Sequence, residues 1–331
     1  MSSLKNRSNR EKPILDVRNL ETWFPVKAGL LGRTGHYIRA VDRVSLHVNP
    51  REIVALVGES GCGKSTLGSS LAGLLPIRSG EFFYRGKSAI KNNCIQTSVI
   101  QNKVQIIFQD PYSSLNPKHT VYEILSFPFL FHGVCEKSEV KDYVANLLKQ
   151  VGLPADYMNR YPHAFSGGQR QRVSIARAIG MKPDLIICDE IVSSLDLSIQ
   201  AQIVELLLEL RDQFSLSLLF IAHDLSLVRT LSDRLYVMYL GKVVESGHTK
   251  DVLSEPLHPY TRALVRSVPS LDRGCPPLVL GGEVPSFSNM PLGCSFQNRC
   301  SNMSRQCERE PQIEKFGNRE FRCFNPIKRN Y

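Results

Sequence analysis

Residues 58–66 form a glycine-rich run that ends in a lysine and two hydroxyl side chains. In order they are Gly58, Glu59, Ser60, Gly61, Cys62, Gly63, Lys64, Ser65 and Thr66. They match the pattern G-x-x-x-x-G-K-[ST], in which glycines let consecutive backbone N–H groups converge on phosphate oxygens. Lys64 could reach the two outer phosphates of a nucleotide, and the Ser65 hydroxyl could coordinate Mg²⁺. The run therefore predicts a phosphate-binding loop.

A second group of chemically active residues follows an apolar run at residues 185–188. This run ends in two carboxylates, Asp189 and Glu190. At a strand end beside the phosphate loop, Asp189 would hold the water shell of Mg²⁺ and Glu190 would orient or activate an attacking water. An ordinary strand end would look the same, so this assignment depends on the loop at Lys64.

A second element that could bind an anion lies just before a helical pattern. Phe165 is followed by Ser166, Gly167, Gly168 and Gln169. Such a segment places free backbone N–H groups at a helix N-terminus, where an anion is favoured. Because the chain already has a phosphate loop, a second phosphate-binding element makes sense if it serves the nucleotide of another subunit.

With these motifs in order, the sequence resembles the ABC-type ATPases, whose LSGGQ signature here carries Phe165 in place of Leu. The resemblance implies that Gln109 contacts Mg²⁺ and couples to a transmembrane partner. It places Asp196 in the loop that crosses the dimer interface, and His223 at the γ-phosphate. Phe24 best matches the aromatic that stacks on adenine and Tyr37 is the second choice, while a plain core role stays open for both.

The complete motif set implies two composite sites in a head-to-tail dimer. Ser166 and Gly168 of one subunit would close over the ATP that Lys64 of the other holds, and hydrolysis would release this clamp. A regulatory subunit without hydrolysis is the rival interpretation. The presence of both Asp189–Glu190 and His223 argues against it.

Two further stretches resemble the oligopeptide/dipeptide/nickel importer ATPases. Residues 108–117 match the glutamine-loop region of that family, and His258-Pro259-Tyr260 matches the element that opens its C-terminal extension. The likeness spans about residues 15–326, and the long segment at residues 24–40 is most similar to the F-type member. Arg51 and Ile191 depart from the family pattern without removing a catalytic group.

The resemblance also implies partners and a place of action. F-type and D-type ATPases of that family form a heterodimer beneath two permease subunits, and an extracytoplasmic binding protein delivers the peptide. The chain would then be a peripheral ATPase at the cytoplasmic face of the cell membrane, driving import of di- or oligopeptides. Import of nickel or another small solute is the alternative, because ATPase subunits of this family do not touch the cargo.

The net charge of +10 raises a different possibility, a soluble ABC ATPase that acts on nucleic acid. Against it, the chain has one ATPase domain rather than a tandem pair, and no long coiled coil. Its basic residues are dispersed and form no stripe interleaved with aromatic side chains. We therefore expect no nucleic-acid partner.

Four of the nine cysteines lie close together near the C-terminus. Their spacing is C-x5-C-x6-C-x15-C, made by Cys294, Cys300, Cys307 and Cys323. Four thiolates in a Pro-rich segment suggest a structural metal site, but the spacing between the cysteines is too wide to identify the metal. In the importer family the matching pattern is associated with a [4Fe–4S] cluster, which is favoured here over Zn²⁺, and unliganded thiols are the third possibility. Cys62, Cys94, Cys135, Cys188 and Cys275 lack such spacing and indicate ordinary thiols.

Short apolar runs alternate with helical patterns around these motifs. The runs at residues 53–57, 104–108, 185–188 and 216–222 are short enough for strands that are buried on both faces. Helical patterns lie at residues 64–75, 139–151, 169–179 and 199–214. The alternation predicts an α/β fold with a mostly parallel sheet. The resemblance specifies a P-loop NTPase of the ABC ATPase type, with a RecA-like core and an antiparallel β subdomain.

Two stretches depart from this alternation. Residues from about 112 to 180 are mainly helical and predict an inserted helical subdomain, whereas the chain after about residue 253 is rich in Pro, Gly and Cys. We therefore expect an ATP-binding domain at residues 14–253 and a small separate extension at residues 254–331. No segment approaches the ~18–20 unbroken apolar residues of a membrane span. Residues 1–12 are polar and do not resemble a secretory signal.

Overall fold

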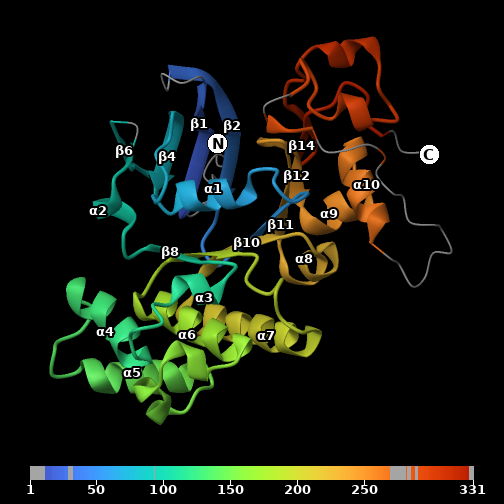
Figure 1. Cartoon of the computed structure of the whole chain (residues 1–331). Helices are drawn as coiled ribbons and strands as arrows, with labels where there is room; N and C mark the ends of the chain where they lie inside the picture. The colour runs from blue at the N-terminus through green and yellow to red at the C-terminus, as the bar shows by residue number, and fades with distance from the viewer. Residues whose placement is uncertain are drawn as a thin grey trace, which may run out of the picture.

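Strands from distant parts of the chain meet in one central sheet (Figure 1). The structure is a computed structural model and describes residues 12–28, 33–92, 94–268, 281, 285–287 and 290–327. The sheet has the order β13-β14-β12-β11-β3-β10-β9-β8, and the strands from β11 to β8 run parallel. These elements are β3 (Ile53–Val57), β8 (Val104–Ile107), β9 (Leu185–Asp189), β10 (Ser217–Ala222), β11 (Arg234–Tyr239) and β12 (Lys242–His248). The mostly parallel sheet predicted from the apolar runs is confirmed.

Both faces of the central sheet are buried. Because successive side chains of a strand point to opposite sides, alternate residues of each strand join different cores. On β10, Leu218 and Phe220 join the hydrophobic core that includes α6 (Gly167–Gly180) and α7 (Leu197–Phe214). Leu219 and Ile221 join a second core with α1 (Lys64–Leu71). A strand covered on both sides needs apolar residues at every position, which is why these runs carry no polar alternation.

A second sheet covers the α1 side of the molecule and is antiparallel, as expected. Its strand order is β2-β1-β4-β5, and its side chains share the second core with α1. The strands are β1 (Leu15–Ala28), β2 (Arg33–Val48), β4 (Ser79–Tyr84) and β5 (Lys87–Ser88). The small elements β6 (Ile90–Lys91), β7 (Cys94–Ile95) and α2 (Thr97–Ile100) follow.

A helical lobe lies on the opposite side of the central sheet in Figure 1. It contains α3 (Pro111–Ser114), α4 (Val121–Phe131) and α5 (Val140–Gln150), and it leads into α6. At the start of α4 the side chains of Thr120 and Glu123 each accept a backbone N–H of the other, which fixes that helix end. No strand lies between residues 112 and 180 of the described chain, in agreement with the predicted helical insertion.

The helix after the phosphate loop is shorter than the pattern at residues 64–75 predicts. It ends at Leu71 because Gly73 adopts a left-handed φ of 74°. The N–H groups of Gly73 and Leu74 turn back to the carbonyls of Ser70 and Ser69, at 3.0 and 2.9 Å. This is the Schellman arrangement that commonly ends helices, and periodicity alone does not reveal it.

The C-terminal extension is less separate than its composition suggests. Strand β14 (Arg319–Phe321) pairs with β12 of the central sheet, and β13 (Glu314–Phe316) pairs with β14. The helices α8 (Leu225–Leu231), α9 (Thr249–Ser254) and α10 (Pro259–Ser267) lead the chain from the sheet into this region. Strand pairing therefore joins the extension to the central sheet. The sequence did not indicate this contact, because a three-residue strand is too short to show a period-2 pattern.

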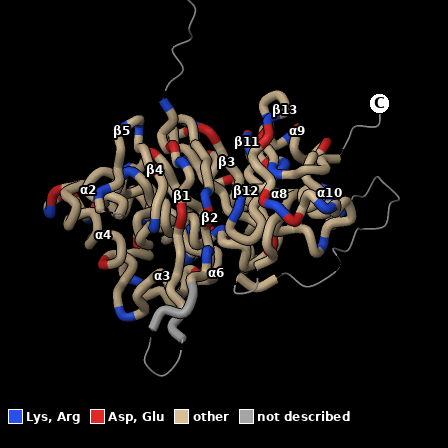
Figure 2. Tube along the Cα trace, turned by 90° about the horizontal axis from the view of Figure 1, so that it is seen from above, with Lys and Arg blue, Asp and Glu red and all other residues tan. Residues whose placement is uncertain are grey.

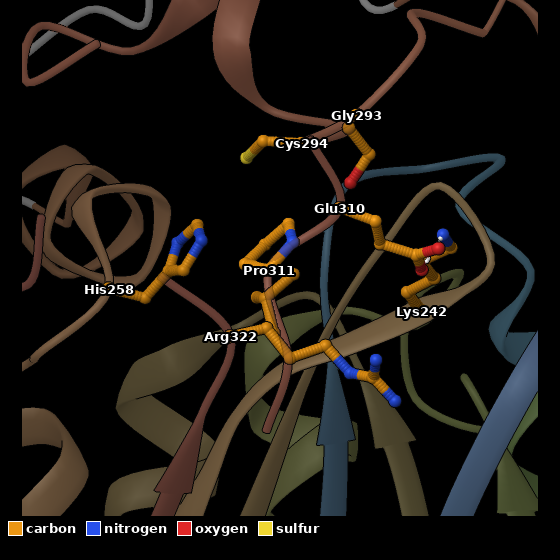
Figure 3. Close-up of a pocket in the computed structure, with 9 residues that line it drawn as sticks. Lys242, His258, Gly293, Cys294, Glu310, Pro311 and Arg322 are labelled. Atoms are coloured by element: carbon orange, nitrogen blue, oxygen red, sulfur yellow. Dashed lines mark hydrogen bonds and ion pairs between the residues drawn. The ribbon is translucent and has the colours of Figure 1, made fainter. Parts of the chain in front are cut away.

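Glu310 joins the extension to the antiparallel sheet by charge. Its carboxylate accepts two hydrogen bonds from the Arg43 guanidinium, at 2.6 and 2.7 Å, and pairs with Lys242. Figure 3 shows Glu310 and Lys242 pointing toward each other beside Arg322 and Pro311. The cavity between these side chains holds only about 10 Å³, which is barely room for one water. The extension is therefore tightly packed against the ATPase domain.

This cluster predicts a pH-dependent contribution to stability. Burial alone would raise the pKa of Glu310, but the hydrogen bonds from Arg43 and Lys242 outweigh it and lower the pKa to about 2. Since the unfolded carboxyl titrates near pH ~4.3, the contribution is present above that pH and is lost as the pH falls toward 2.

Glu310→Gln should therefore lower the free energy of unfolding by about 1–2 kcal/mol at pH 7, after allowance for solvent screening. Urea unfolding followed by circular dichroism at several pH values measures this. The difference from the unmodified chain should shrink steadily below pH ~4. The exposed neighbour Glu308→Gln is the matched control and should have no effect. A difference that stays constant down to pH 3 would contradict the assignment.

Candidate functional site

The phosphate loop lies between β3 and α1, at the carboxyl end of a buried parallel strand. Gly63 has a left-handed φ of 107°, and a Cβ at this position would overlap the carbonyl oxygen of Ala40. The Lys64 side chain is buried and donates to the carbonyl oxygens of Gly58 and Glu59, at 2.9 and 3.1 Å. These contacts hold the Lys64 ammonium over the loop, in reach of an anion bound there.

A hydroxyl and a carboxylate meet directly behind the loop. Ser65 Oγ donates to Asp189 Oδ1 at 3.0 Å, which joins the start of α1 to the end of β9. Asp189 is buried, and burial raises its pKa, opposed by the Ser65 hydrogen bond and increased further by the charge of Glu190. The pair supplies the oxygen donors that Mg²⁺ prefers. The structure thus brings together two of the three residues, Ser65 and Asp189, for which the sequence predicts contact with Mg²⁺; the third is Gln109.

Glu190 lies at the centre of the remaining polar groups. Its carboxylate is 3.7 Å from Lys64 Nζ and 3.9 Å from His223 Nδ1, and it accepts a hydrogen bond of 3.1 Å from Gln109 Nε2. Glu190 itself has a left-handed φ of 47°, which non-glycine residues adopt at a cost and mostly at functional sites. Four residues predicted from separate motifs therefore converge on one point.

Ser193 belongs to this cluster but was missed by sequence reasoning. Its Oγ accepts a 3.2 Å hydrogen bond from Gln109 Nε2 and donates to the Glu190 carbonyl oxygen at 2.8 Å. The available signal was its position three residues after Glu190 in a turn, which is weak without the fold.

The signature segment forms a well-defined helix start. Ser166 Oγ accepts the Gln169 N–H, and Gln169 Oε1 accepts the Ser166 N–H, so α6 begins with a complete capping box. Phe165, which replaces the usual Leu, is buried and packs edge-on against Tyr157 with ring centroids 5.6 Å apart. A Cβ on Gly168 would lie 2.6 Å from Ile199 Cγ2, so this glycine allows close packing of α6 on α7.

The helices that follow the signature segment and the phosphate loop pack on opposite faces of the central sheet. Helix α1 packs in the core on one face and α6 in the core on the other, as Figure 1 also shows. Ser166 is exposed, as is Asp196, the residue that precedes α7. The structure therefore does not bring Ser166 or Asp196 to the Lys64 cluster of the same chain.

The two aromatic candidates for adenine stacking lie on adjacent strands. Phe24 of β1 pairs in register with Ile38 of β2 and is half-buried, whereas Tyr37 is exposed and packs against Trp23 at 6.1 Å. The guanidinium groups of Arg39 and Arg78 lie 4.5 and 4.0 Å from the Trp23 ring. Residues 29–32, part of the F-type segment, lie outside the described residues, as does Cys275.

The four C-terminal cysteines share one region of the extension. Cys294, Cys307 and Cys323 are buried, Cys300 is half-buried, and the Cys294 N–H donates to the Cys307 carbonyl at 2.9 Å. Burial, followed by the other three thiols, raises the pKa of Cys323 to about 12. Among the residues described, no three His, Cys, Asp or Glu side chains come close enough to hold a metal ion.

Two residues of the extension reach the phosphate loop itself. Tyr260 Oη accepts the backbone N–H of Glu59 at 2.8 Å, and Arg299 makes two hydrogen bonds to the Glu59 carboxylate at 2.6 and 2.9 Å. Sequence reasoning used Tyr260 only as a mark of the subfamily and did not single out Arg299.

In the part of the chain that is described, no helix has the length and apolar content needed to cross a bilayer.

Comparison with known proteins agrees with this geometry. The model of the ABC transporter family matches residues 41–193, which include the phosphate loop, the signature and the Asp189–Glu190 pair. The family described as oligopeptide/dipeptide transporter, C-terminal region, matches residues 244–307.

Several relatives are similar over nearly their whole length. The chain is 40% identical to the dipeptide transport ATP-binding protein DppF of Haemophilus influenzae, over 94% of this chain and 96% of that protein. It is 44% identical to the oligopeptide transport ATP-binding protein AppF of Bacillus subtilis, over 91% and 93%. Salmonella typhimurium OppF, an oligopeptide transport ATP-binding protein, is 42% identical over 92% and 94%.

Solved structures support the fold. CbiO1 of Clostridium perfringens, part of an ABC transporter complex, superimposes with a TM-score of 0.61 at 28% identity, covering 74% of this chain and 92% of that one. The ATP-binding cassette MJ0796, a dimer in a post-hydrolysis state with ADP and phosphate, gives 0.61 at 26% identity, covering 71% and 98%. This chain therefore belongs to the ABC transporter family, as an ATP-hydrolysing member that carries the oligopeptide/dipeptide transporter C-terminal region.

Proposed function

We propose that this chain is the ATPase subunit of a membrane importer for di- or oligopeptides and works at the cytoplasmic face of the membrane. The observation that carries the proposal is the combination in one chain of a complete hydrolysis cluster around Glu190 with the C-terminal region of the peptide transporter family. Relatives named for dipeptide, oligopeptide and glutathione import support this cargo class. Import of nickel or another small solute by the same machinery is the alternative.

The residues of the cluster take separate roles in the proposed reaction. Lys64 and the loop N–H groups bind the phosphates, and Glu190 orients and deprotonates the attacking water. His223 contacts the γ-phosphate, while Gln109 links the site to the helical lobe. Mg²⁺ held by Ser65, Gln109 and Asp189 would neutralise charge on the phosphates. Phe24 is the proposed adenine-stacking residue.

The ATP site is completed by a partner subunit in this proposal. Support comes from the placement of α6 and α1 on opposite faces of the sheet and from the exposure of Ser166, which leave the segment from Ser166 to Gln169 open to a nucleotide on another chain. Asp196 would line the same interface. A D-type ATPase is the proposed partner, above which two permease subunits and an extracytoplasmic binding protein complete the importer. We assign residues 14–253 to the ATP-binding domain and residues 254–331 to the extension.

An exposed apolar patch on α4 suits a permease contact. Phe127 and Phe131 are each 70% exposed and stack with centroids 5.9 Å apart, and Leu130 lies between them in the sequence. Grouped exposed aromatics of this kind mark protein interaction sites. The patch belongs to the helical lobe, into which the segment after Gln109 leads.

Replacing both Phe127 and Phe131 by Ser should weaken the permease contact and leave the ATPase chemistry intact. We expect co-purification with permease subunits from solubilised membranes to fall at least about tenfold, while the ATP affinity of the isolated chain changes less than about twofold. Phe214→Ser, on an exposed aromatic of α7, is the matched control. Undiminished co-purification of the double variant would rule out this patch as the contact.

The same pull-down separates the peptide importer from a nucleic-acid ATPase. Permease subunits in the membrane fraction support the proposal, and co-purified RNA or DNA would overturn it. Figure 2 shows Lys and Arg interspersed with Asp and Glu along the described trace, with no single basic stripe. This distribution favours the importer.

The extension is proposed to hold a [4Fe–4S] cluster on Cys294, Cys300, Cys307 and Cys323, with Zn²⁺ as the alternative. The support is the family resemblance and the chemistry of the donors, four free thiols in one region of the extension. In the described structure these thiols are not gathered into a metal site, so the cluster would have to draw them together. Anaerobically purified protein should contain about four iron and four sulfide per chain and be coloured. Cys300→Ser should lose the iron, whereas Cys94→Ser on the exposed Cys94 should keep it. A colourless protein with one zinc per chain would contradict the cluster.

A further inference from the structure

Two described residues of the C-terminal extension hold the phosphate loop, and both contact Glu59. One contact involves the Glu59 backbone, whose N–H donates to Tyr260 Oη at 2.8 Å. The other contact involves the Glu59 side chain, whose carboxylate accepts two hydrogen bonds from Arg299. Tyr260 and Arg299 are 201 and 240 residues away in sequence, so only the folded extension can make these contacts.

Tyr260 is fixed from several sides. Its own N–H donates to His258 Nδ1 at 3.1 Å, which caps the start of α10. His258 is fully buried, and this burial lowers its pKa to about 3, so that the ring stays neutral and can accept. The Tyr260 ring is completely buried and lies 4.6 Å from Tyr239 and 5.3 Å from Phe296, centroid to centroid. The hydroxyl therefore marks a fixed point for the loop backbone.

Arg299 provides a charged contact with little exposure to solvent. Its side chain is only 4% exposed, and that of Glu59 is 22% exposed. The two nitrogen–oxygen distances of 2.6 and 2.9 Å correspond to a fork-like Arg–carboxylate pair, which is both strong and directional. Arg299 thus neutralises a carboxylate that belongs to the phosphate loop.

An uncompensated charge on Glu59 would oppose the anion that the loop binds. Lys64, which must attract the phosphates, donates to the carbonyl oxygen of this same residue at 3.1 Å. A shift of Glu59 would therefore displace one of the two anchors of the Lys64 ammonium. We propose that Tyr260 and Arg299 are positioning residues for ATP binding, which fix the backbone of Glu59 and cancel its charge. The inference rests on ATP binding at this loop and not on the cargo or the cysteine ligands.

The test is equilibrium ATP and ADP binding to the full-length chain. Arg299→Gln should raise the dissociation constant for ATP about tenfold, and that for ADP less, because ADP carries less charge. Glu59→Gln leaves the Arg299 cation beside the loop and should bind ATP at least as tightly as the unmodified chain. The double variant Arg299→Gln with Glu59→Gln should return to within about twofold of normal affinity.

Two further variants separate positioning from general stability. Arg43→Gln breaks a different Arg–Glu pair of the extension, with Glu310, which does not touch the loop. It should lower the thermal midpoint and leave ATP affinity unchanged. Tyr260→Phe keeps the ring and removes the acceptor of the Glu59 N–H, and it should weaken ATP and ADP binding alike.

The sign of these changes decides the outcome. Normal ATP affinity in Arg299→Gln, weaker affinity in Glu59→Gln, or no recovery in the double variant would overturn the charge argument. An equal loss of affinity in Arg43→Gln would show that the extension acts only through global stability. If Arg299→Gln does not fold, the Glu59→Gln and Tyr260→Phe variants still test both halves of the proposal.

Discussion

The variant Glu190→Gln should bind ATP with normal affinity and hydrolyse it at least about a hundredfold more slowly. Removing a general base costs this much, because the amide cannot take a proton from the attacking water. Binding should persist since Lys64 and the loop N–H groups are untouched, and the new amide oxygen can still accept the Gln109 hydrogen bond. Because the γ-phosphate is not cleaved, the dimer clamp should stay closed.

Two measurements check this expectation. Phosphate release reports turnover, and size-exclusion chromatography with ATP reports the trapped dimer, each with the partner ATPase present. Glu209→Gln, on an exposed carboxylate of α7, is the control and should hydrolyse ATP normally. Normal turnover in Glu190→Gln would show that Glu190 is not the general base. Loss of ATP binding would show that the Glu190 carboxylate is needed for the structure of the phosphate loop.

The second large effect is expected at the signature. Gly168→Asp should reduce turnover in the assembled complex about a hundredfold or more, while this chain keeps its own ATP affinity within about twofold. The new side chain would meet Ile199 at 2.6 Å and would place a negative charge at the helix end proposed to face the partner's γ-phosphate. Neither Gly168 nor Ile199 contacts Lys64, whose helix α1 packs on the opposite face of the sheet from α6.

Photolabelling with an ATP analogue, resolved by subunit, tests the division of labour. With Gly168→Asp this chain should still be labelled, whereas Lys64→Ala should abolish labelling of this chain and spare the partner. Gly133→Asp adds the same charge at an exposed loop glycine with open space around it. Its left-handed φ of 63° strains a new side chain, but Asp is among the residues that tolerate this conformation best, so the control should cost some stability and leave labelling unchanged. If Gly168→Asp abolished labelling of its own chain, the composite site would be wrong.

The sequence predicted those parts of the structure that local patterns encode. Strand β3 matched its predicted bounds because an apolar run that ends in glycine has few alternatives. The Lys64, Asp189, Glu190 and His223 cluster followed from motifs that stand at the ends of neighbouring strands, where parallel topology gathers them. The helical insertion was equally visible in its periodicity.

The remaining features depend on contacts between distant residues. The left-handed backbone of Glu190 is imposed by its surroundings, since no local pattern favours it. The contacts of Tyr260 and Arg299 with Glu59 join residues separated by more than half of the chain. Strand β14 has only three residues, too few for a pattern that would predict its position in the sheet. Such features emerge only when the tertiary fold is known.

The pairing of β14 with β12 has a consequence for how the chain is made. β12 ends at His248, whereas β14 ends at Phe321, about 70 residues later. At a synthesis rate of roughly 5–20 residues per second, the nascent sheet exposes an unpaired edge for several seconds. Unpaired edges recruit other strands and promote aggregation. A chain that stopped between His248 and Arg319 would therefore keep Lys64, Glu190 and His223 but leave the edge of β12 unpaired.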